Sequence, residues 1–215
     1  TLAIVNVVGS SIAREADNVF YTLAGPEISV ATTKAYSAQL IAIYAIAVEL
    51  GRVKGLIDDA MYKHYIEEIQ ALPDKIEKII ENKERIQWIA NKFAYSKDVF
   101  FIGRGLDYAI CLEGSLKMKE ISYIHSEAYA AGELKHGPIA LIDDGILVIS
   151  CLTQEGLYEK TTSNMTEVKA RGAVLLAVTT YGHYNIEDNV NYVTYIPKAD
   201  EHFMASLAVV PLQLM

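Results

Sequence analysis

Cysteine is scarce in this sequence, whose 215 residues contain only Cys111 and Cys151. Two cysteines are too few for the disulfide framework of a small secreted domain, so the sequence predicts a protein of the reducing cytosol. Long apolar runs are also missing. The longest, Leu40–Val48, is far shorter than the roughly 20 residues that a membrane-spanning helix requires. The sequence therefore predicts neither a disulfide-stabilised domain nor a membrane span.

An excess of basic residues is missing as well. The chain has 19 Lys and Arg against 27 Asp and Glu, a formal net charge of −8. A nucleic-acid binder needs a basic surface to neutralise phosphates, so this class of protein is not expected. With 52% apolar and 21% charged residues the composition is that of a globular protein, either one large domain or two small ones.

Both ends of the sequence are apolar, whereas chain termini are usually polar and frayed. Residues 2–8 form an apolar run that begins almost at once, and residues 207–215 form another that has no helix-ending signal after it. We therefore expect substantial sequence beyond both ends.

Short apolar runs alternate with longer helical patterns, which predicts an α/β fold with a parallel sheet covered by helices on both faces. The predicted strands are Leu2–Val7, Asn18–Thr22, Val99–Gly103, Ile146–Cys151, Val174–Val178 and Tyr192–Ile196. Thr32–Leu50 predicts a buried helix, and Asp59–Ala94 predicts two helices, with a break or kink at Pro73. Residues 56–92 are the most charged part of the chain, and we interpret them as a helical connection between two strand–helix blocks, 1–55 and 93–215.

The loop Gly103-Arg104-Gly105 follows a predicted buried strand, where α/β sheets commonly bind ligands. The glycines would allow a phosphate to approach the backbone, and Arg104 would supply a counter-charge. A dinucleotide fingerprint needs a third glycine, which is missing here. A plain tight turn and a phosphate loop both remain open.

Glu113, Lys117 and Glu120 have the spacing of one helix face. Such a stripe is usually a solvated network of surface ion pairs. Here the neighbouring residues are apolar, which indicates a largely buried helix, and buried charges need partners or a function. A carboxylate beside a lysine can remove a proton from carbon while the ammonium tunes its pKa. Structure and proton transfer both remain open.

The two histidines near this stripe do not have metal-ligand spacing, because His125 and His136 are too far apart along the chain and no third histidine lies near them. His136 instead lies in a loop punctuated by glycine and proline, where it is free to act as an acid or base. Cys111 and Cys151 have apolar neighbours and are expected in the core. Thr32 or Thr33 is expected to cap the helix that follows, or to bind phosphate or sugar hydroxyls there.

Two stretches carry a family resemblance: LEGSLKMKEISYIHSEAYAAGELKHGPIALID, at 112–143, and GPEISVATTKAYSAQL, at 25–40. They closely resemble the isomerase part of the glutamine-dependent fructose-6-phosphate aminotransferases, within the broader sugar isomerase (SIS) family. The resemblance covers nearly the whole chain. It implies two flavodoxin-like SIS units, with 1–55 as the last part of the first, 56–92 as the connection and 93–215 as the second.

The resemblance also implies a function. Fructose 6-phosphate would be aminated with glutamine-derived ammonia and isomerised to glucosamine 6-phosphate, an amino-sugar precursor, in a cytoplasmic homodimer. Glu120 would be the base that moves the proton between C1 and C2, Lys117 would assist it, and Glu113 would belong to the same site. His136 would open the sugar ring from across the dimer interface. No metal or organic cofactor is implied.

The resemblance also assigns sugar contacts to Val30 and Thr32. The phosphate loop, the Schiff-base lysine and the glutaminase domain of the family have no counterpart in these 215 residues. We therefore expect the chain alone to be inactive or nearly so. Two alternatives remain open, namely another SIS enzyme that deaminates or deglycates sugar phosphates, and a SIS sensor that binds sugar phosphates without catalysis.

Overall fold

The computed structural model describes residues 1–215, which form two compact units, Thr1–Ala71 and Leu72–Met215. The boundary falls inside helix α3 (Asp59–Ile80). The expected division into 1–55, 56–92 and 93–215 stays a prediction. None of the helices combines the length and the hydropathy that crossing a membrane requires.

Unit 1 contains a pair of parallel strands followed by a long helix. Its elements are β1 (Leu2–Val5), α1 (Ser11–Glu15), β2 (Asn18–Tyr21), α2 (Lys34–Val53) and the first part of α3. The two strands pair along their whole length. The Ser10 hydroxyl accepts the N–H of Ala13 at 3.3 Å and thereby caps α1. Both predicted strands are present, although the first ends at Val5 instead of Val7.

Unit 2 is a five-stranded parallel sheet with helices on both faces. Its helices and strands after α3 are α4 (Lys83–Lys92), β3 (Asp98–Gly103), α5 (Leu106–Ser122), β4 (His125–Ala130), β5 (Leu147–Leu152), α6 (Tyr158–Lys169), β6 (Val174–Thr180), β7 (Tyr192–Ile196) and α7 (Met204–Leu214). Short 3₁₀ helices are η1 (Leu134–His136), η2 (Pro138–Leu141), η3 (Glu155–Leu157), η4 (Tyr184–Asp188) and η5 (Glu201–Phe203).

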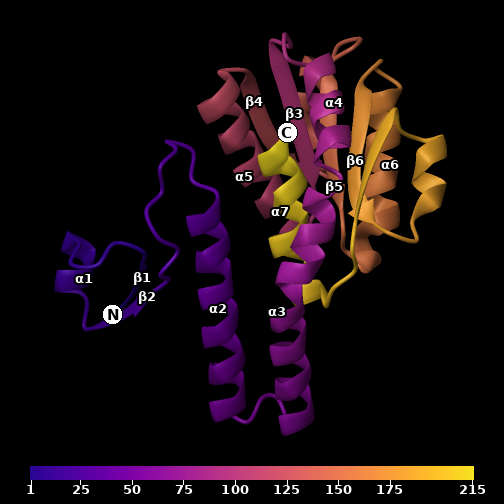
Figure 1. Ribbon diagram of the computed structural model, residues 1–215. Helices are drawn as coiled ribbons and strands as arrows, with labels where there is room; N and C mark the ends of the chain where they lie inside the picture. The colour runs from indigo at the N-terminus through magenta and orange to yellow at the C-terminus, as the bar shows by residue number, and fades with distance from the viewer. The chain divides into compact units, whose positions relative to one another are not determined.

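The strand order is β4-β3-β5-β6-β7. Counted from the first strand of unit 2, this is the order 2-1-3-4-5 of flavodoxin-like folds, and the predicted fold class is confirmed for this unit. From the interior strand β3 the chain first moves outward to β4 and then returns to β5, so the topological switch point lies between β3 and β5. The usual right-handed crossovers then place α5 and α6 on opposite faces of the sheet (Figure 1).

Each face of the sheet has its own apolar packing. On the α6 face, fifteen buried side chains form one cluster, which includes Phe100, Ile102, Val148, Met165 and Leu175. On the other face α5 and α7 pack against each other, and α4 packs against α7. Strand β5 is buried over its whole length and β3 from Val99 to Gly103, which explains why their sequences are continuous apolar runs.

The expectation of a buried helix at Thr32–Leu50 is wrong in this structure. Only Ala42 and Val48 are buried in α2, and the side chains of Leu50 and Val53 are 52% and 74% exposed. An apolar helix is buried only where another layer covers it, and the two strands of unit 1 cover little of α2.

The expected break at Pro73 is also wrong, because α3 continues through this residue to Ile80. Proline removes one helical hydrogen bond and crowds the preceding turn. Leu72 and Ile79 are each 1% exposed, and their burial on both sides of the proline holds the helix together. The chain instead leaves the helix after Ile80, and a new helix begins at Lys83.

Strand β4 was not among the predicted strands. Its sequence, His-Ser-Glu-Ala-Tyr-Ala, contains no Val or Ile. It is an edge strand, and such a strand needs less apolar cover than an interior one. The sequence signal for this strand is the alternation of small residues (Ser126, Ala128) with larger ones (His125, Glu127).

Candidate functional site

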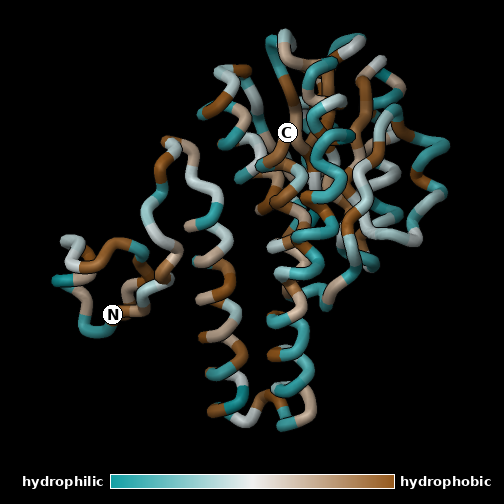
Figure 2. The backbone as a smooth tube through the Cα atoms, viewed as in Figure 1, coloured by the Kyte–Doolittle hydropathy of each residue, from teal (hydrophilic) through white to brown (hydrophobic).

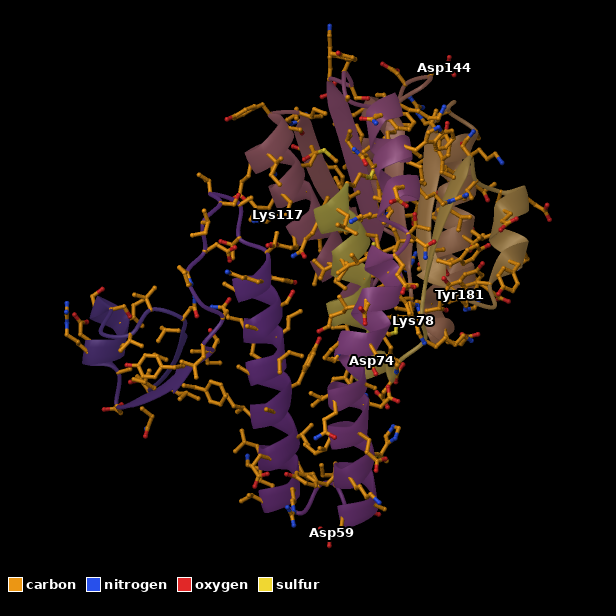
Figure 3. The ribbon with its side chains drawn as sticks, viewed as in Figure 1. Asp59, Asp74, Lys78, Lys117, Asp144 and Tyr181 are labelled. Atoms are coloured by element: carbon orange, nitrogen blue, oxygen red, sulfur yellow. The ribbon has the colours of Figure 1, made fainter.

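The predicted stripe on α5 forms a connected cluster in which Lys117 lies between two carboxylates. Its Nζ is 2.5 Å from Glu120 Oε2 and 3.6 Å from Glu113 Oε1. The side chain of Lys117 is 4% exposed, that of Glu113 12% and that of Glu120 32%. The lysine is therefore a buried cation with a partner on each side, and Glu120 is the carboxylate that solvent or a ligand can reach. Figure 3 labels Lys117 on α5.

Close packing on both sides of α5 makes this burial possible. A Cβ added at Gly103, before the helix, would lie 2.6 Å from the backbone carbon of Asp107. A Cβ added at Gly114 would lie 2.7 Å from a methyl of Leu212 in α7 and 3.0 Å from the ring of Phe101 in β3. The two glycines thus let the helix lie directly against the sheet and α7.

Burial changes the acid strength of Glu113. Desolvation raises its pKa above the usual value, and the neighbouring Lys117 opposes part of this rise. A carboxylate at hydrogen-bond distance from an ammonium can accept a proton and return it, while the ammonium stabilises a negative oxygen nearby. The cluster therefore has the groups that proton transfer at a carbon next to a carbonyl requires.

His136, the fourth predicted catalytic residue, is not near this cluster within one chain. It is an exposed residue at the end of η1, beyond the carboxyl end of β4. Hydrogen bonds from Ala131 N to Gly103 O and from Glu133 N to Ala130 O hold the segment before it at that end of the sheet. Leu134 is buried in the apolar cluster on the α6 face.

The cluster lies toward the opposite end of the strands. Helix α5 starts after the carboxyl end of β3 and ends before the amino end of β4, so it runs antiparallel to both strands. At 1.5 Å per residue, Glu120 lies roughly 20 Å along the helix from its start. His136 and Glu120 therefore lie toward opposite ends of the sheet.

The Gly103-Arg104-Gly105 loop does lie at the switch point, but the chain itself supplies partners for the Arg104 side chain and for the N–H that follows the loop. The guanidinium of Arg104 donates from Nε (3.1 Å) and Nη2 (2.9 Å) to Asn164 Oδ1. The Gln154 side chain accepts the N–H of Leu106 at 2.8 Å. Between the two expectations for this loop, these contacts favour the tight turn.

Asp107, in the first turn of α5, is a polar residue that sequence reasoning missed. It is 1% exposed, and its carboxylate accepts hydrogen bonds from the hydroxyl and the N–H of Thr153 and from the N–H of Gln154. Burial raises the pKa of this carboxyl, although the hydrogen bonds oppose the rise. The available signal was an acidic residue in the first turn of a helix after a glycine loop.

The predicted sugar contacts lie in unit 1. Val30 is an exposed side chain in the segment before α2, and Thr32 is half-buried. Thr33 occupies the N-cap position of α2, but its side chain makes no capping hydrogen bond. Glu27 Oε2 instead accepts the N–H of Ala35 at 3.3 Å, a capping contact that the sequence did not indicate.

The other candidate groups have structural neighbours. His125 Nδ1 lies 2.8 Å from Asp98 Oδ1 at the amino end of β4. His136 lies beyond the carboxyl end of the same strand, so the two histidines do not pair. Cys111 and Cys151 are fully buried, as expected, and the interaction of the Cys151 thiol with Cys111, together with burial, raises the pKa of Cys151. No group of three or more His, Cys, Asp or Glu side chains is placed to hold a metal ion.

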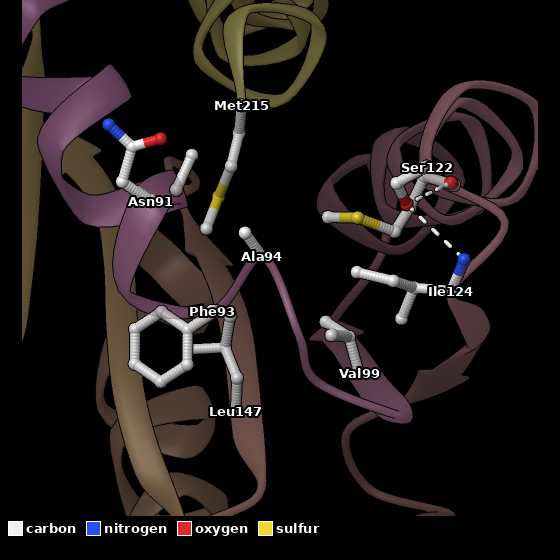
Figure 4. Close-up of a pocket in the computed structure, with 10 residues that line it drawn as sticks. Asn91, Phe93, Ala94, Val99, Ser122, Ile124, Leu147 and Met215 are labelled. Atoms are coloured by element: carbon white, nitrogen blue, oxygen red, sulfur yellow. Dashed lines mark hydrogen bonds between the residues drawn. The ribbon is translucent and has the colours of Figure 1, made fainter.

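A pocket of about 210 Å³ lies at the amino end of the sheet, next to the C-terminal end of α5 (Figure 4). Apolar side chains dominate its wall, and Ser122 and Asn91 are the polar ones. The Ser122 hydroxyl is bonded to Met118 O and to the N–H of Ile124. The pocket therefore offers apolar contact without an acid or base.

Comparison with known proteins finds a matching family and close relatives. The family model described as "SIS domain" matches residues 1–49 and 92–215. The glutamine–fructose-6-phosphate aminotransferase (isomerizing) of Clostridium tetani is 54% identical over 213 residues, 99% of this chain and 35% of that protein. The enzyme of the same name from Methanosarcina mazei is 50% identical over 100% of this chain and 35% of its own length. The chain thus spans about a third of these relatives.

A structural comparison agrees with these sequence comparisons. The C-terminal domain of glucosamine-fructose-6-phosphate aminotransferase from Francisella tularensis superposes with a TM-score of 0.92 at 36% identity, over 99% of this chain and 60% of that one. A glucosamine-6-phosphate deaminase from Thermotoga maritima, at 24% identity and a TM-score of 0.72, shares the fold.

Proposed function

The chain belongs to the SIS domain family, and we propose that it is a section of the isomerase region of a glutamine-dependent fructose-6-phosphate aminotransferase. The proposed reaction combines fructose 6-phosphate with glutamine-derived ammonia to form glucosamine 6-phosphate, in amino-sugar precursor synthesis. The observation that carries the proposal is the burial of Lys117 between two carboxylates, on the helix that carries the resembling motif.

In the proposed mechanism Glu120 moves a proton between C1 and C2 of the open-chain sugar. It is the most exposed of the three charged groups, so it is the one that a substrate can meet. Lys117, whose Nζ lies 2.5 Å from Glu120, stabilises the developing charge on a neighbouring substrate oxygen. Glu113 helps to hold the buried ammonium in place from its other side.

We propose further that the site is completed by a second copy of the chain. His136 and Glu120 lie at opposite ends of the sheet in one chain, so a His136 that opens the sugar ring at Glu120 must come from the partner of a homodimer. Val30 and Thr32 of unit 1 are the proposed sugar contacts. The chain spans 35% of the related enzymes, and we expect these 215 residues alone to be inactive.

We propose the cytosol as the location of the protein, since its two cysteines are free and buried. The roles proposed for residues of this chain are acid–base roles, and they require no metal or organic cofactor.

Glu120→Gln in the intact protein tests the role of the base. The substitution keeps the size of the side chain and removes its basicity, so the formation of glucosamine 6-phosphate should fall by about 10²–10⁴-fold. Glu67→Gln, on an exposed pair in α3, is the matched control and should keep the wild-type rate. An unchanged rate in Glu120→Gln would exclude this residue as the base. The absence of this product from the wild-type protein would favour a deaminase, a deglycase or a sensor.

Mixing two inactive variants tests the completed dimer. Glu120→Gln and His136→Ala subunits, coexpressed, form heterodimers in which one of the two sites has both native residues. If His136 acts across the interface, the mixture should recover about a quarter of the wild-type activity. No recovery in heterodimers isolated with two affinity tags would show that both residues act from the same chain.

A further inference from the structure

Asp107 is a buried carboxylate that has no cationic partner. Its residue is 1% exposed, and it takes part in none of the ion pairs of the molecule. Buried carboxylates are normally paired with a cation, because an isolated charge loses its hydration on burial. Asp107 is held instead by the N–H of Thr153 at 2.8 Å, the N–H of Gln154 at 3.4 Å and the hydroxyl of Thr153. These are the contacts that proteins commonly offer to a bound anion.

The position of Asp107 in the topology matters. It lies in the first turn of α5, and its partners follow β5, so it bridges the carboxyl ends of β3 and β5. In sheets with this strand order, ligands bind in the crevice at that switch point. Asp107 therefore lies where the topology would place a ligand.

Gln154 and Arg104 lie close to the glycines at this end of the sheet. Gln154 Oε1 accepts the N–H of Leu106 and lies 2.5 Å from where a Cβ of Gly105 would be. The Arg104 guanidinium is held by Asn164 and lies 2.8 Å from where a Cβ of Gly132 would be. The N–H groups of Leu106, Thr153 and Gln154, and two of the three guanidinium nitrogens of Arg104, thus donate to acceptors of the protein.

We propose that Asp107 is a built-in anion, whose carboxylate occupies the place of a ligand phosphate at the switch point of unit 2 and keeps this crevice closed to phosphate. This claim concerns binding alone, and it is tested without an activity measurement.

Asp107→Ser in the intact protein is the decisive variant, because it removes the charge and leaves space. The thermal midpoint of the variant should lie below that of the wild type. Inorganic phosphate should then raise it by about 3 °C more than it raises the wild-type midpoint, since a ligand that binds only the folded state stabilises it. Chloride at the same ionic strength should not reproduce this extra rise.

Two variants serve as controls. Asp107→Asn keeps the crevice filled, so it should show the phosphate dependence of the wild type. Asp98→Ser removes an aspartate from the other end of β3, where the side chain is 46% exposed beside His125, and it should also behave as the wild type.

The proposal is wrong if Asp107→Ser responds to phosphate no more than the wild type does, or if Asp98→Ser gains the same response. If Asp107→Ser does not fold on expression, refolding from denaturant supplies the measurement. The yield should then be higher in phosphate than in chloride, and equal yields would overturn the proposal. Failure of the aminotransferase function would leave these outcomes unchanged.

Discussion

Helices α2 and α5 show opposite relations between hydropathy and burial. Helix α2 is rich in Ala, Ile and Leu, yet Ala42 and Val48 are its only buried residues. Helix α5 carries Glu113, Lys117 and Glu120, yet six of its residues are buried, Lys117 among them. Figure 2 shows the hydrophobic colouring along much of α2. Burial in this molecule thus follows the layers that surround a helix more closely than the composition of the helix.

The same contrast appears in two ion pairs with equal spacing. Lys63–Glu67 on α3 and Glu113–Lys117 on α5 are both four residues apart, with N–O distances of 3.7 Å and 3.6 Å. The Lys63 side chain is 77% exposed and that of Lys117 is 4% exposed. Equal spacing therefore yields a solvated pair on one helix and a buried charge cluster on the other.

The largest effect is expected from removing the buried cation. Lys117→Met leaves Glu113 and Glu120 close together without a counter-charge, so the free energy of unfolding should fall by about 3 kcal/mol. Lys63→Met should change it by about 0.3 kcal/mol. Urea denaturation of both variants measures this difference. Equal losses would show that the surroundings of Lys117 do not set the strength of its ion pairs.

Glycine-to-alanine substitutions should have opposite signs on the two helices. At Gly114 the new Cβ meets Leu212 at 2.7 Å and Phe101 at 3.0 Å, and the overpacking should cost about 1 kcal/mol net of the better helix propensity. At Gly51 in α2 the nearest atoms, of Ile57, lie 3.5 Å away, so Gly51→Ala should stabilise by about 0.5–1 kcal/mol. Thermal unfolding of both variants is the test. A stabilising Gly114→Ala would contradict the close packing of α5.

The smallest effect concerns pH. Burial raises the folded-state pKa of Glu113 above its ordinary value of 4.5, so the folded protein binds more protons than the unfolded chain near and above that pH. Stability should then decrease as the pH rises from 4.5 through the raised pKa, by an amount that Glu113→Gln removes. Denaturation curves between about pH 4 and 8 measure the two slopes. Glu67→Gln, on the exposed pair, is the control and should keep the wild-type dependence of stability on pH. The prediction is contradicted if Glu113→Gln also keeps the wild-type dependence.

Several features were readable from the sequence because they depend on local pattern. The central strands β3, β5 and β6 are continuous apolar runs, and these predict strands with covered faces. The helical spacing of Glu113, Lys117 and Glu120 is enough to predict that the three side chains share one face of a helix. The polar edge strand β4 and the continuity of α3 through Pro73 escaped prediction, since neighbouring elements decide both.

The sequence by itself determined the α/β class, the strand–helix alternation and the chemical groups of the candidate site. Only the tertiary structure decided that Lys117 is a buried cation, that Asp107 fills the switch-point crevice and that His136 lies at the far end of the sheet from Glu120. The physical reason is that periodicity is a property of a few neighbouring residues. Burial, hydrogen-bond partners and the separation of two side chains depend on the direction of α5 against the sheet and on the order of the strands.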